Sequence, residues 1–212
     1  MKKLFWYFDF ISPYAYFQST RLNVLTEKVE IHCIPILFAG LLDFWGQKGP
    51  AEVKPKKLFT FRHCAWRAYR DNIPYQTPSK HPFNPLRALR LSIALGNNIV
   101  IIQKIFNCIW VNGYLPDDED GWLKIKETLN AEHGDELIAD EKIKLELLEN
   151  GKGAIAAGVF GVPTLRIDDE LFWGDDCLDM VQFYIDNPGV LKSKNMRRIL
   201  ELKPSSRRIK NS

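Results

Sequence analysis

Residues 158–167, Gly-Val-Phe-Gly-Val-Pro-Thr-Leu-Arg-Ile, place a Val-Pro step between a glycine-rich turn and a short apolar strand. Proline at the first residue of a strand removes no hydrogen bond that a central position would need. An X–Pro bond is also the peptide bond for which the cis form is least unfavourable. A cis bond between Val162 and Pro163 would turn the N–H and C=O of Val162 outward, where an extended peptide could pair with them as an added strand. A trans bond that only opens the strand is the alternative.

Composition places the chain among ordinary globular proteins, with 46% hydrophobic and 26% charged residues over 212 positions. The net charge of +3 is too small to indicate nucleic-acid binding by itself. No apolar run is long enough to span a membrane, and Asp9 interrupts the apolar N-terminus too early for a secretory signal. Four cysteines without a C-x-x-C motif favour free thiols in a reducing compartment, so we expect a cytoplasmic protein: Cys33, Cys64, Cys108 and Cys177.

The order of predicted elements indicates the fold class. Residues 4–10 and 29–37 have strand composition and flank a predicted helix at 13–28, which makes a βαβ unit. Helical patterns then occupy 57–71, 85–95, 99–111, 121–133 and 141–157, around a proline-rich loop at 73–85. Strands at 165–167 and 170–173 form a hairpin before a helix at 177–185. This order predicts an α/β, thioredoxin-like fold of the DsbA-like kind. A thioredoxin-like domain at 1–39 and 158–190 would hold an all-helical insertion at 40–157.

The remaining residues, 191–212, form a basic C-terminal tail. The simpler interpretation is a solvated, partly disordered terminus. Contact with an acidic surface or with nucleic acid is the alternative, because positive charges are concentrated at Lys192, Lys194, Arg197, Arg198, Lys203, Arg207, Arg208 and Lys210.

Three motifs resemble those of one enzyme family. Residues 7–16 (Tyr-Phe-Asp-Phe-Ile-Ser-Pro-Tyr-Ala-Tyr), 158–164 and 171–176 (Leu-Phe-Trp-Gly-Asp-Asp) are similar to motifs of the 2-hydroxychromene-2-carboxylate isomerases. That family is related to the kappa-class glutathione transferases. The loop at 46–50 resembles the family's Gly-Asn-Lys-Pro-Pro loop, with Gln47 in place of Asn. The resemblance covers residues 4–190 and leaves the basic tail outside it.

The resemblance implies a glutathione-dependent isomerase that acts in aromatic-compound catabolism, and we expect a homodimer. The implied reaction adds the glutathione thiolate reversibly to an unsaturated aromatic acid, allows rotation about the new single bond, and eliminates glutathione unchanged. In this interpretation Val162 pairs with the tripeptide backbone, and Asp175 and Asp176 hold the γ-glutamyl ammonium. The full set of expected glutathione-binding residues is Gln47, Val162, Pro163, Trp173, Gly174, Asp175 and Asp176.

Ser12 is the candidate catalytic residue, because it stands where a thioredoxin-like enzyme carries its attacking cysteine. The N-terminus of a helix carries partial positive charge, which favours an ionised sulfur nearby. A serine cannot form a disulfide, but its hydroxyl can donate a hydrogen bond to a thiolate brought by glutathione. Such a bond favours the thiolate by roughly 1.5–3 kcal/mol, or about one to two pKa units. Ser-Pro is also an ordinary helix N-cap, and Asp175 and Asp176 are equally compatible with helix capping.

Other residues narrow the interpretation. The family often has Arg at the position of Cys177, so the role of that Arg is lost or is taken by another cation such as Lys48. The aromatic stripe of Phe59, Trp66 and Tyr69 favours core packing over a cofactor site, with an apolar wall for an aromatic substrate as the alternative. The histidines share no metal-binding motif, which predicts structural or exposed roles for His32, His63, His81 and His133.

Two other functions remain open. A kappa-like glutathione transferase would conjugate small electrophiles and consume glutathione. A non-catalytic thioredoxin-fold protein would bind extended peptides through Val162, or nucleic acid through the tail. A thiol–disulfide oxidoreductase is disfavoured because C-x-x-C is missing. We therefore expect a small-molecule substrate, no membrane partner and no nucleic acid.

Overall fold

A computed structural model describes residues 1–206, and the predicted residues Arg207, Arg208 and Lys210 of the tail lie outside that range. The chain divides into two compact units, Met1–Cys177 and Leu178–Ser212. The division predicted from the sequence, with its helical insertion at 40–157, stays a prediction. No helix of the described chain combines the length and the apolar character that a membrane span requires.

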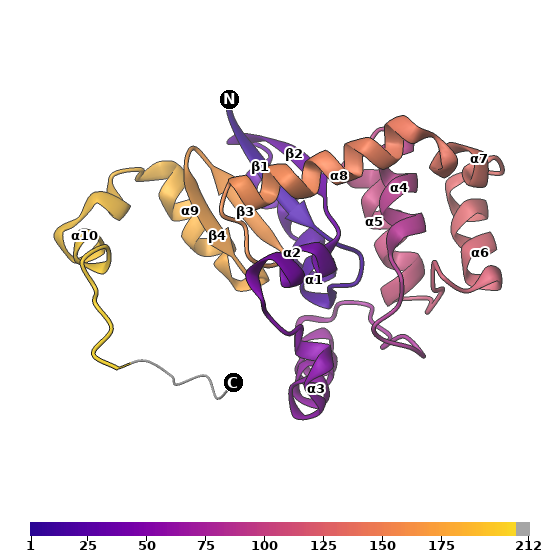
Figure 1. The fold of residues 1–212 in the computed structure, drawn as a ribbon, viewed down its shortest axis with the longest axis horizontal. Helices are drawn as coiled ribbons and strands as arrows, with labels where there is room; N and C mark the ends of the chain where they lie inside the picture. Colours follow the sequence, from indigo (N-terminus) through magenta and orange to yellow (C-terminus); the bar gives the residue numbers. More distant parts are fainter. Residues whose placement is uncertain (207–212) are drawn as a thin grey trace. The chain divides into compact units, whose positions relative to one another are not determined.

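A four-stranded mixed sheet in the order β2-β1-β3-β4 organises the first unit (Figure 1). β1 (Lys2–Phe8) pairs in parallel with β2 (Val29–Pro35), which confirms the βαβ unit. β1 also pairs antiparallel with β3 (Thr164–Ile167), and β3 pairs antiparallel with β4 (Glu170–Trp173). The thioredoxin-like order of elements predicted from the sequence is therefore confirmed.

The helix that follows β1 is shorter than predicted. Residues 13–28 form α1 (Pro13–Ser19) and a separate 3-10 turn, η1 (Leu22–Leu25). The hydroxyls of Ser19 and Thr20 donate to backbone carbonyls three residues earlier, at 2.7 and 2.8 Å. Side chains that bond the backbone locally compete with continued helix, which explains why α1 ends at Ser19.

The segment between β2 and β3 is helical, as expected, but it contains two helices that the sequence did not predict. α2 begins directly after β2, and α7 begins at Gly134, where the sequence predicted only a helix stop. α8 continues through Asn150 and Gly153 without a break. The helical elements are α2 (Phe38–Trp45), η2 (Pro50–Glu52), α3 (Lys54–Asp71), α4 (Leu86–Ala94), α5 (Ile99–Trp110), α6 (Glu119–Leu129), α7 (Gly134–Ala139) and α8 (Glu141–Ala156).

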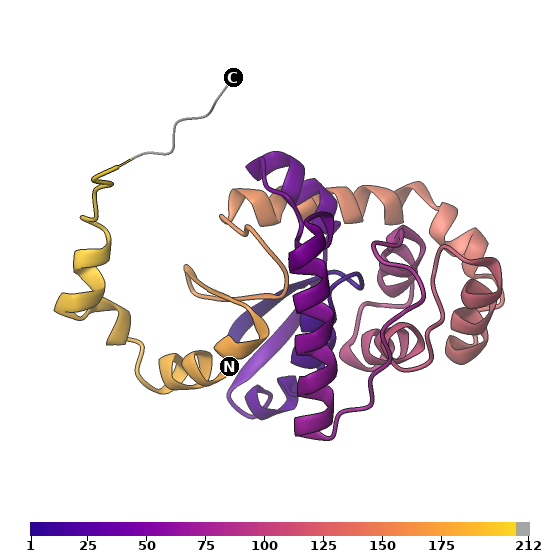
Figure 2. The same ribbon diagram turned by 90° about the horizontal axis from the view of Figure 1, so that it is seen from below.

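Alternate residues of β1 face two different helical layers. Trp6 donates its indole N–H to Gln18 of α1 at 2.8 Å and lies beside Phe106 of α5. Tyr7 points to the opposite face, where it packs in one apolar cluster with Leu41 of α2 and Ala154 of α8. Figure 2 shows α2 and α8 on one side of the strands and α1 on the other. The sheet is thus covered on both faces, as its aromatic first strand predicts.

The second unit contains α9 (Leu178–Asp186), η4 (Val190–Lys192) and α10 (Lys194–Ile199). η4 and α10 contain no buried residue. The solvated, partly disordered terminus expected for residues 191–212 stays a prediction. The tail nevertheless contains a short helix, α10, that the sequence interpretation did not include.

Candidate functional site

Ser12 caps the N-terminus of α1. Its backbone is extended (φ −93°, ψ 114°), and its hydroxyl oxygen accepts a hydrogen bond from the backbone N–H of Ala15 at 3.2 Å. Pro13 follows at the first helical position, where a missing N–H has no cost. The N-cap alternative is therefore confirmed, and it places the hydroxyl at the positive end of the helix.

The Val162–Pro163 bond is cis, and it lies across from Ser12. The Ser12 hydroxyl donates to the backbone C=O of Val162 at 3.4 Å, a long hydrogen bond. The Val162 carbonyl therefore has a contact that the sequence interpretation did not anticipate. The N–H of Val162 has no hydrogen-bond partner among residues 1–206, so it remains available for an extended ligand.

A cavity of about 460 Å³ opens beside these two residues. Its volume lies within the range of small-molecule sites. Of the predicted glutathione-binding residues it brings together Gln47, Val162 and Trp173. Within the described chain, Pro163 and Gly174 adjoin this wall without lining it. The lining includes Ser12, Tyr14, Phe38, Leu42, Gln47, Lys48, Lys57, Phe61, His81, Phe160, Val162 and Trp173.

The two predicted aspartates, Asp175 and Asp176, differ in burial. Asp175 is buried, and its carboxylate accepts a short hydrogen bond from Arg67 and a second one from Arg21 at 3.1 Å. Arg21 also donates to the backbone C=O of Asp175 at 2.6 Å. This carboxylate is already neutralised by arginines and does not line the cavity, which corrects its expected contact with an ammonium group. Asp176 is exposed, and it remains the available acid of the pair.

The loop after α2 presents Gln47 and Lys48 to the cavity. Gly46 ends α2 with φ +60°, a conformation that glycine adopts without steric cost, and the Gln47 N–H then bonds the Leu42 carbonyl at 2.9 Å. Both Gln47 and Lys48 are exposed and line the cavity. Lys48 thus places a cation at the cavity, and its substitution for the family's arginine stays a prediction.

Cys177 occupies the position of that arginine and is not a reactive thiol. Its sulfur donates to the Gly174 carbonyl at 2.8 Å, and burial raises its pKa to about 12. The positive charge next to Asp175 comes from Arg21 and Arg67 instead. All four cysteines are free thiols, as predicted.

Two residues of the site were missed by the sequence interpretation. Asp9 appeared there only as an interruption of an apolar run, yet its carboxylate accepts the N–H groups of Ile11 at 3.1 Å and Phe38 at 2.8 Å. Burial raises the pKa of Asp9 to about 7, against the lowering effect of these hydrogen bonds. The feature of the sequence that could have revealed Asp9 is its position as the single acidic residue at the end of an aromatic strand.

The second missed residue is His81, which lines the cavity. Nε2 of His81 lies 2.9 Å from the Ile11 carbonyl oxygen. Because a carbonyl oxygen can only accept, Nε2 carries the proton and donates it. Burial lowers the pKa of His81, and Nδ1 is buried without a partner in the described chain; both features favour the neutral ring. No local pattern could have revealed this contact, which joins residues 70 positions apart.

The aromatic stripe on α3 does not form core, which overturns the favoured interpretation. Phe59, Trp66 and Tyr69 are 69%, 51% and 89% exposed. The wall of the cavity comes instead from Phe61, on another face of α3, and from Tyr14, whose hydroxyl lies 3.2 Å from Nδ1 of His63.

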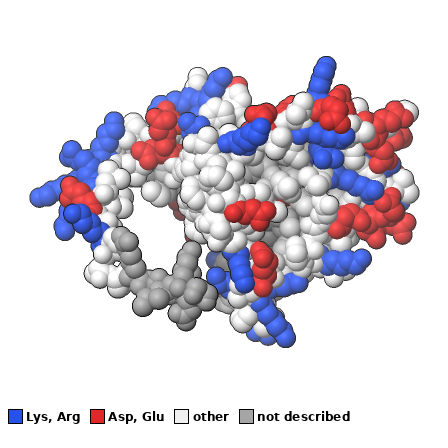
Figure 3. Space-filling view, in the orientation of Figure 1, with Lys and Arg blue, Asp and Glu red and all other residues white. Residues whose placement is uncertain are grey.

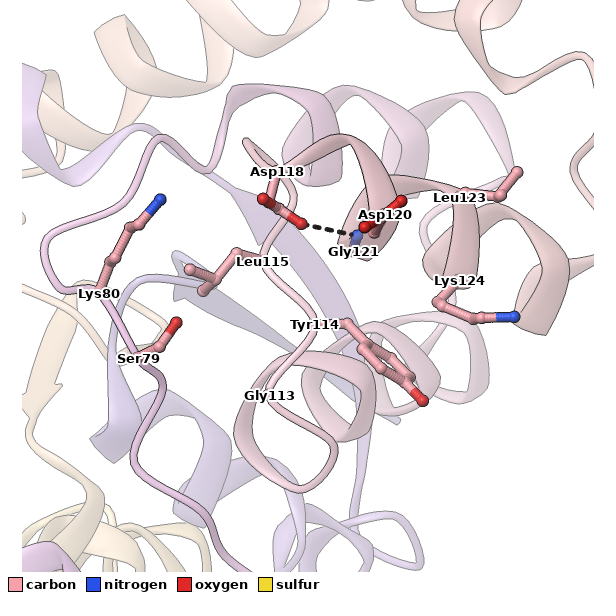
Figure 4. Close-up of a pocket in the computed structure, with 10 residues that line it drawn as sticks. All are labelled: Ser79, Lys80, Gly113, Tyr114, Leu115, Asp118, Asp120, Gly121, Leu123 and Lys124. Carbon is pink, nitrogen blue, oxygen red and sulfur yellow. Dashed lines mark hydrogen bonds between the residues drawn. The ribbon is translucent and has the colours of Figure 1, made fainter.

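A second cavity, of about 420 Å³, lies at the start of α6 and is drawn in Figure 4. It contains none of the predicted site residues. Its Asp118 already accepts the Gly121 N–H at 3.1 Å as the cap of α6. Across residues 1–206, no three His, Cys, Asp or Glu side chains are grouped as a metal site would require.

Comparison with known proteins identifies the family. The family model of the DSBA-like thioredoxin domain matches residues 3–186. The chain is 26% identical over 183 residues to 2-hydroxychromene-2-carboxylate isomerase of Pseudomonas sp. (strain C18), covering 83% of this chain and 86% of that enzyme. It is 24% identical to glutathione S-transferase kappa 2 of Caenorhabditis elegans, covering 86% and 91% of the two chains.

Among solved structures, a selenomethionine form of 2-hydroxychromene-2-carboxylate isomerase superposes with a TM-score of 0.75 at 23% identity. The superposition covers 95% of this chain and 100% of that one. This likeness supports the fold, and the enzymes named above support the resemblance seen in the motifs. The chain belongs to the DSBA-like thioredoxin domain family.

Proposed function

We propose that the protein is a glutathione-dependent isomerase of unsaturated aromatic acids similar to 2-hydroxychromene-2-carboxylate. The observation that carries the proposal is the Ser12 hydroxyl, which faces Val162 at 3.4 Å beside a largely apolar cavity. The isomerase relative from Pseudomonas sp. (strain C18) supports the choice of reaction.

The residues in and beside the cavity fit a tripeptide with a thiol, except for the buried Asp175. The unpartnered N–H of Val162 offers a strand-like contact to an extended backbone. Lys48 and Gln47 are exposed at the cavity, where they can meet a carboxylate and an amide. Asp176 is exposed and can meet an ammonium group, whereas Asp175 is held by Arg67 and does not fit that role.

Glutathione, when bound, supplies the thiolate that adds reversibly to the double bond of the substrate. Ser12 stabilises the ionised sulfur by donating a hydrogen bond, for which its hydroxyl rotates away from the weakly held Val162 carbonyl. The positive end of α1 acts in the same direction. Phe38, Phe61 and Trp173 provide the apolar wall that orients an aromatic ring and excludes water.

A kappa-like glutathione transferase is the second candidate, favoured by the similarity to the Caenorhabditis elegans transferase. The two activities differ in their use of glutathione, which an isomerase returns and a transferase consumes. The homodimeric state remains a prediction of the same resemblance. The cytoplasmic location and the helical insertion at 40–157 remain predictions from the cysteines and from the order of the elements.

The test combines binding and turnover. Isothermal calorimetry of the full chain with glutathione measures binding, and a panel of hydroxychromene acids, aromatic enones and small electrophiles is then assayed for turnover. Isomerisation with catalytic glutathione supports the proposal, whereas stoichiometric loss of glutathione assigns the transferase. Absence of binding at millimolar glutathione overturns both and leaves a non-catalytic protein that binds peptides through Val162.

A further inference from the structure

The C-terminal segment 190–206 is the part of the described chain that the proposed function does not use. It lies beyond the family match, which ends at residue 186. It contains five Lys or Arg residues and one Glu. Figure 3 shows these basic side chains gathered at the position that α10 has in Figure 1. Within residues 1–206, none of the five basic side chains of this segment forms an ion pair with an acidic side chain. These five residues are Lys192, Lys194, Arg197, Arg198 and Lys203.

α10 separates its apolar and basic residues onto opposite faces. Met196, Ile199 and Leu200 follow the i, i+3, i+4 spacing that places side chains on one side of a helix. Lys194, Arg197 and Arg198 follow the same spacing two positions earlier, which places them about 200° around the helix, on the other side.

Within the described chain, the apolar face of α10 is exposed at its C-terminal end, whereas Met196 is half-buried. Ile199 is 56% exposed and Leu200 is 88% exposed, and Leu202 just beyond the helix is 77% exposed. Adjacent large apolar side chains in contact with water mark an interaction site. Nucleic acid would use the basic face but would leave these aliphatic side chains in water.

We propose that the segment 190–206 docks the protein on anionic lipid surfaces as a peripheral amphipathic anchor. Basic residues on one face and aliphatic residues on the other are the pattern of helices that lie in a membrane interface. The cations contact lipid headgroups, and the aliphatic side chains enter the boundary with the acyl chains. The proposal concerns surface attachment, not a membrane span, and is independent of the catalytic site.

Sedimentation with vesicles tests the proposal with the full chain. The probes are phosphatidylcholine vesicles with and without about one third phosphatidylglycerol. We expect binding only to the anionic vesicles, and release at high salt. The double variant Arg197→Glu/Arg198→Glu should weaken binding about tenfold or more. The matched control Lys104→Glu/Lys142→Glu changes the net charge equally on α5 and α8 and should bind as the wild type does.

A second variant separates lipid from other polyanions. Ile199→Ser/Leu200→Ser keeps every charge, so it should weaken vesicle binding severalfold while leaving binding to heparin unchanged. Thermal unfolding of each variant should match the wild type, because α10 buries no residue. The proposal is overturned by absent binding to the anionic vesicles, by equal loss in the two charge variants, or by a serine variant that binds vesicles normally.

Discussion

The carboxylate of Asp9, at the end of β1, accepts a hydrogen bond of 2.8 Å from the backbone N–H of Phe38, the first residue of α2. Leu37, the N-cap residue of α2, offers no side-chain acceptor, so a residue 29 positions away performs the capping. The other oxygen of Asp9 accepts the N–H of Ile11, one residue before Ser12. One buried acid thus connects the Ser12 loop to the helix that forms a wall of the cavity.

Asp9 should make stability depend on pH. Its pKa is raised from 3.8 to about 7, so the folded state holds more protons than the unfolded state between these values. The free energy of unfolding contributed by Asp9 must therefore decrease as pH rises from about 4 to about 7. The pKa of His81 is lowered from 6.5, so below that pH the unfolded state binds more protons at this residue than the folded state does. The free energy of unfolding that His81 contributes therefore increases as pH rises toward 6.5.

The variant Asp9→Asn isolates this contribution, because the His81 effect is common to variant and wild type. Urea unfolding at about pH 5 and about pH 8 should show a smaller loss of stability with pH in the variant. Asp43→Asn, at an exposed position of α2, is the control and should behave as the wild type. Parallel pH profiles for Asp9→Asn and wild type would show that Asp9 does not titrate as inferred.

Ser12→Ala should reduce turnover much more than it reduces glutathione affinity. Removing a hydrogen bond to the thiolate raises the pKa of the bound thiol by about one to two units, which lowers turnover about tenfold or more near neutral pH. Loss of the N-cap costs about 1 kcal/mol of stability as well. The readouts are turnover, glutathione affinity and the ultraviolet absorbance of the bound thiolate against pH.

Ser19→Ala is the matched control for this experiment. Ser19 is also buried on α1, and its hydroxyl donates only to the Tyr16 carbonyl, at 2.7 Å. Its thiol titration should equal that of the wild type. An unchanged titration in Ser12→Ala would remove Ser12 from the proposed mechanism.

Breaking the pair between Arg67 and Asp175 should be costly. Asp175→Ala leaves the guanidinium of Arg67, itself 6% exposed, buried with only the more distant carboxylate of Asp71, at 3.9 Å, and the expected cost is about 3 kcal/mol. Replacing both members, as in Arg67→Met/Asp175→Leu, should recover most of that loss. The exposed pair of Arg87 and Glu119, at 2.8 Å, provides the comparison, where Glu119→Ala should cost about 1 kcal/mol or less. Urea unfolding measures the free energy of unfolding of all three variants. An equal loss of stability in Asp175→Ala and in Glu119→Ala would contradict the buried role of Asp175.

Gly161 is required for the position of Trp173. A Cβ at Gly161 would lie 2.6 Å from the indole nitrogen of Trp173, so Gly161→Ala must displace that ring from the cavity wall. Glutathione affinity should fall severalfold in Gly161→Ala. In a Trp173→Ala background the same substitution should have no further effect.

Gly153→Ala is the control for the glycine substitution. Nothing lies within 4 Å of a Cβ at that position of α8, so the helix should gain roughly 0.5–1 kcal/mol and glutathione affinity should not change. An additive loss in the Gly161→Ala/Trp173→Ala double variant would show that the clash is not with Trp173.

Local pattern was sufficient for the sheet and for the position of Ser12. The aromatic run at the N-terminus, Ser-Pro after it, and the turn at Asp168 between two short strands specify β1, the start of α1 and the β3–β4 hairpin. These features depend on residues within a few positions of one another, which is why the sequence alone indicated a thioredoxin-like order of elements.

The sequence by itself determined the succession of strands and helices along the chain and the cap at Ser12, whereas the tertiary structure decided what surrounds them. α2 is capped from a distance of 29 residues by Asp9, and Asp175 meets Arg67 across 108 residues. Phe59, Trp66 and Tyr69 face solvent because the buried face of α3 is occupied by Cys64, Arg67 and Ala68. Such contacts join positions far apart in the chain, so no local periodicity records them, and only the folded chain brings their partners together.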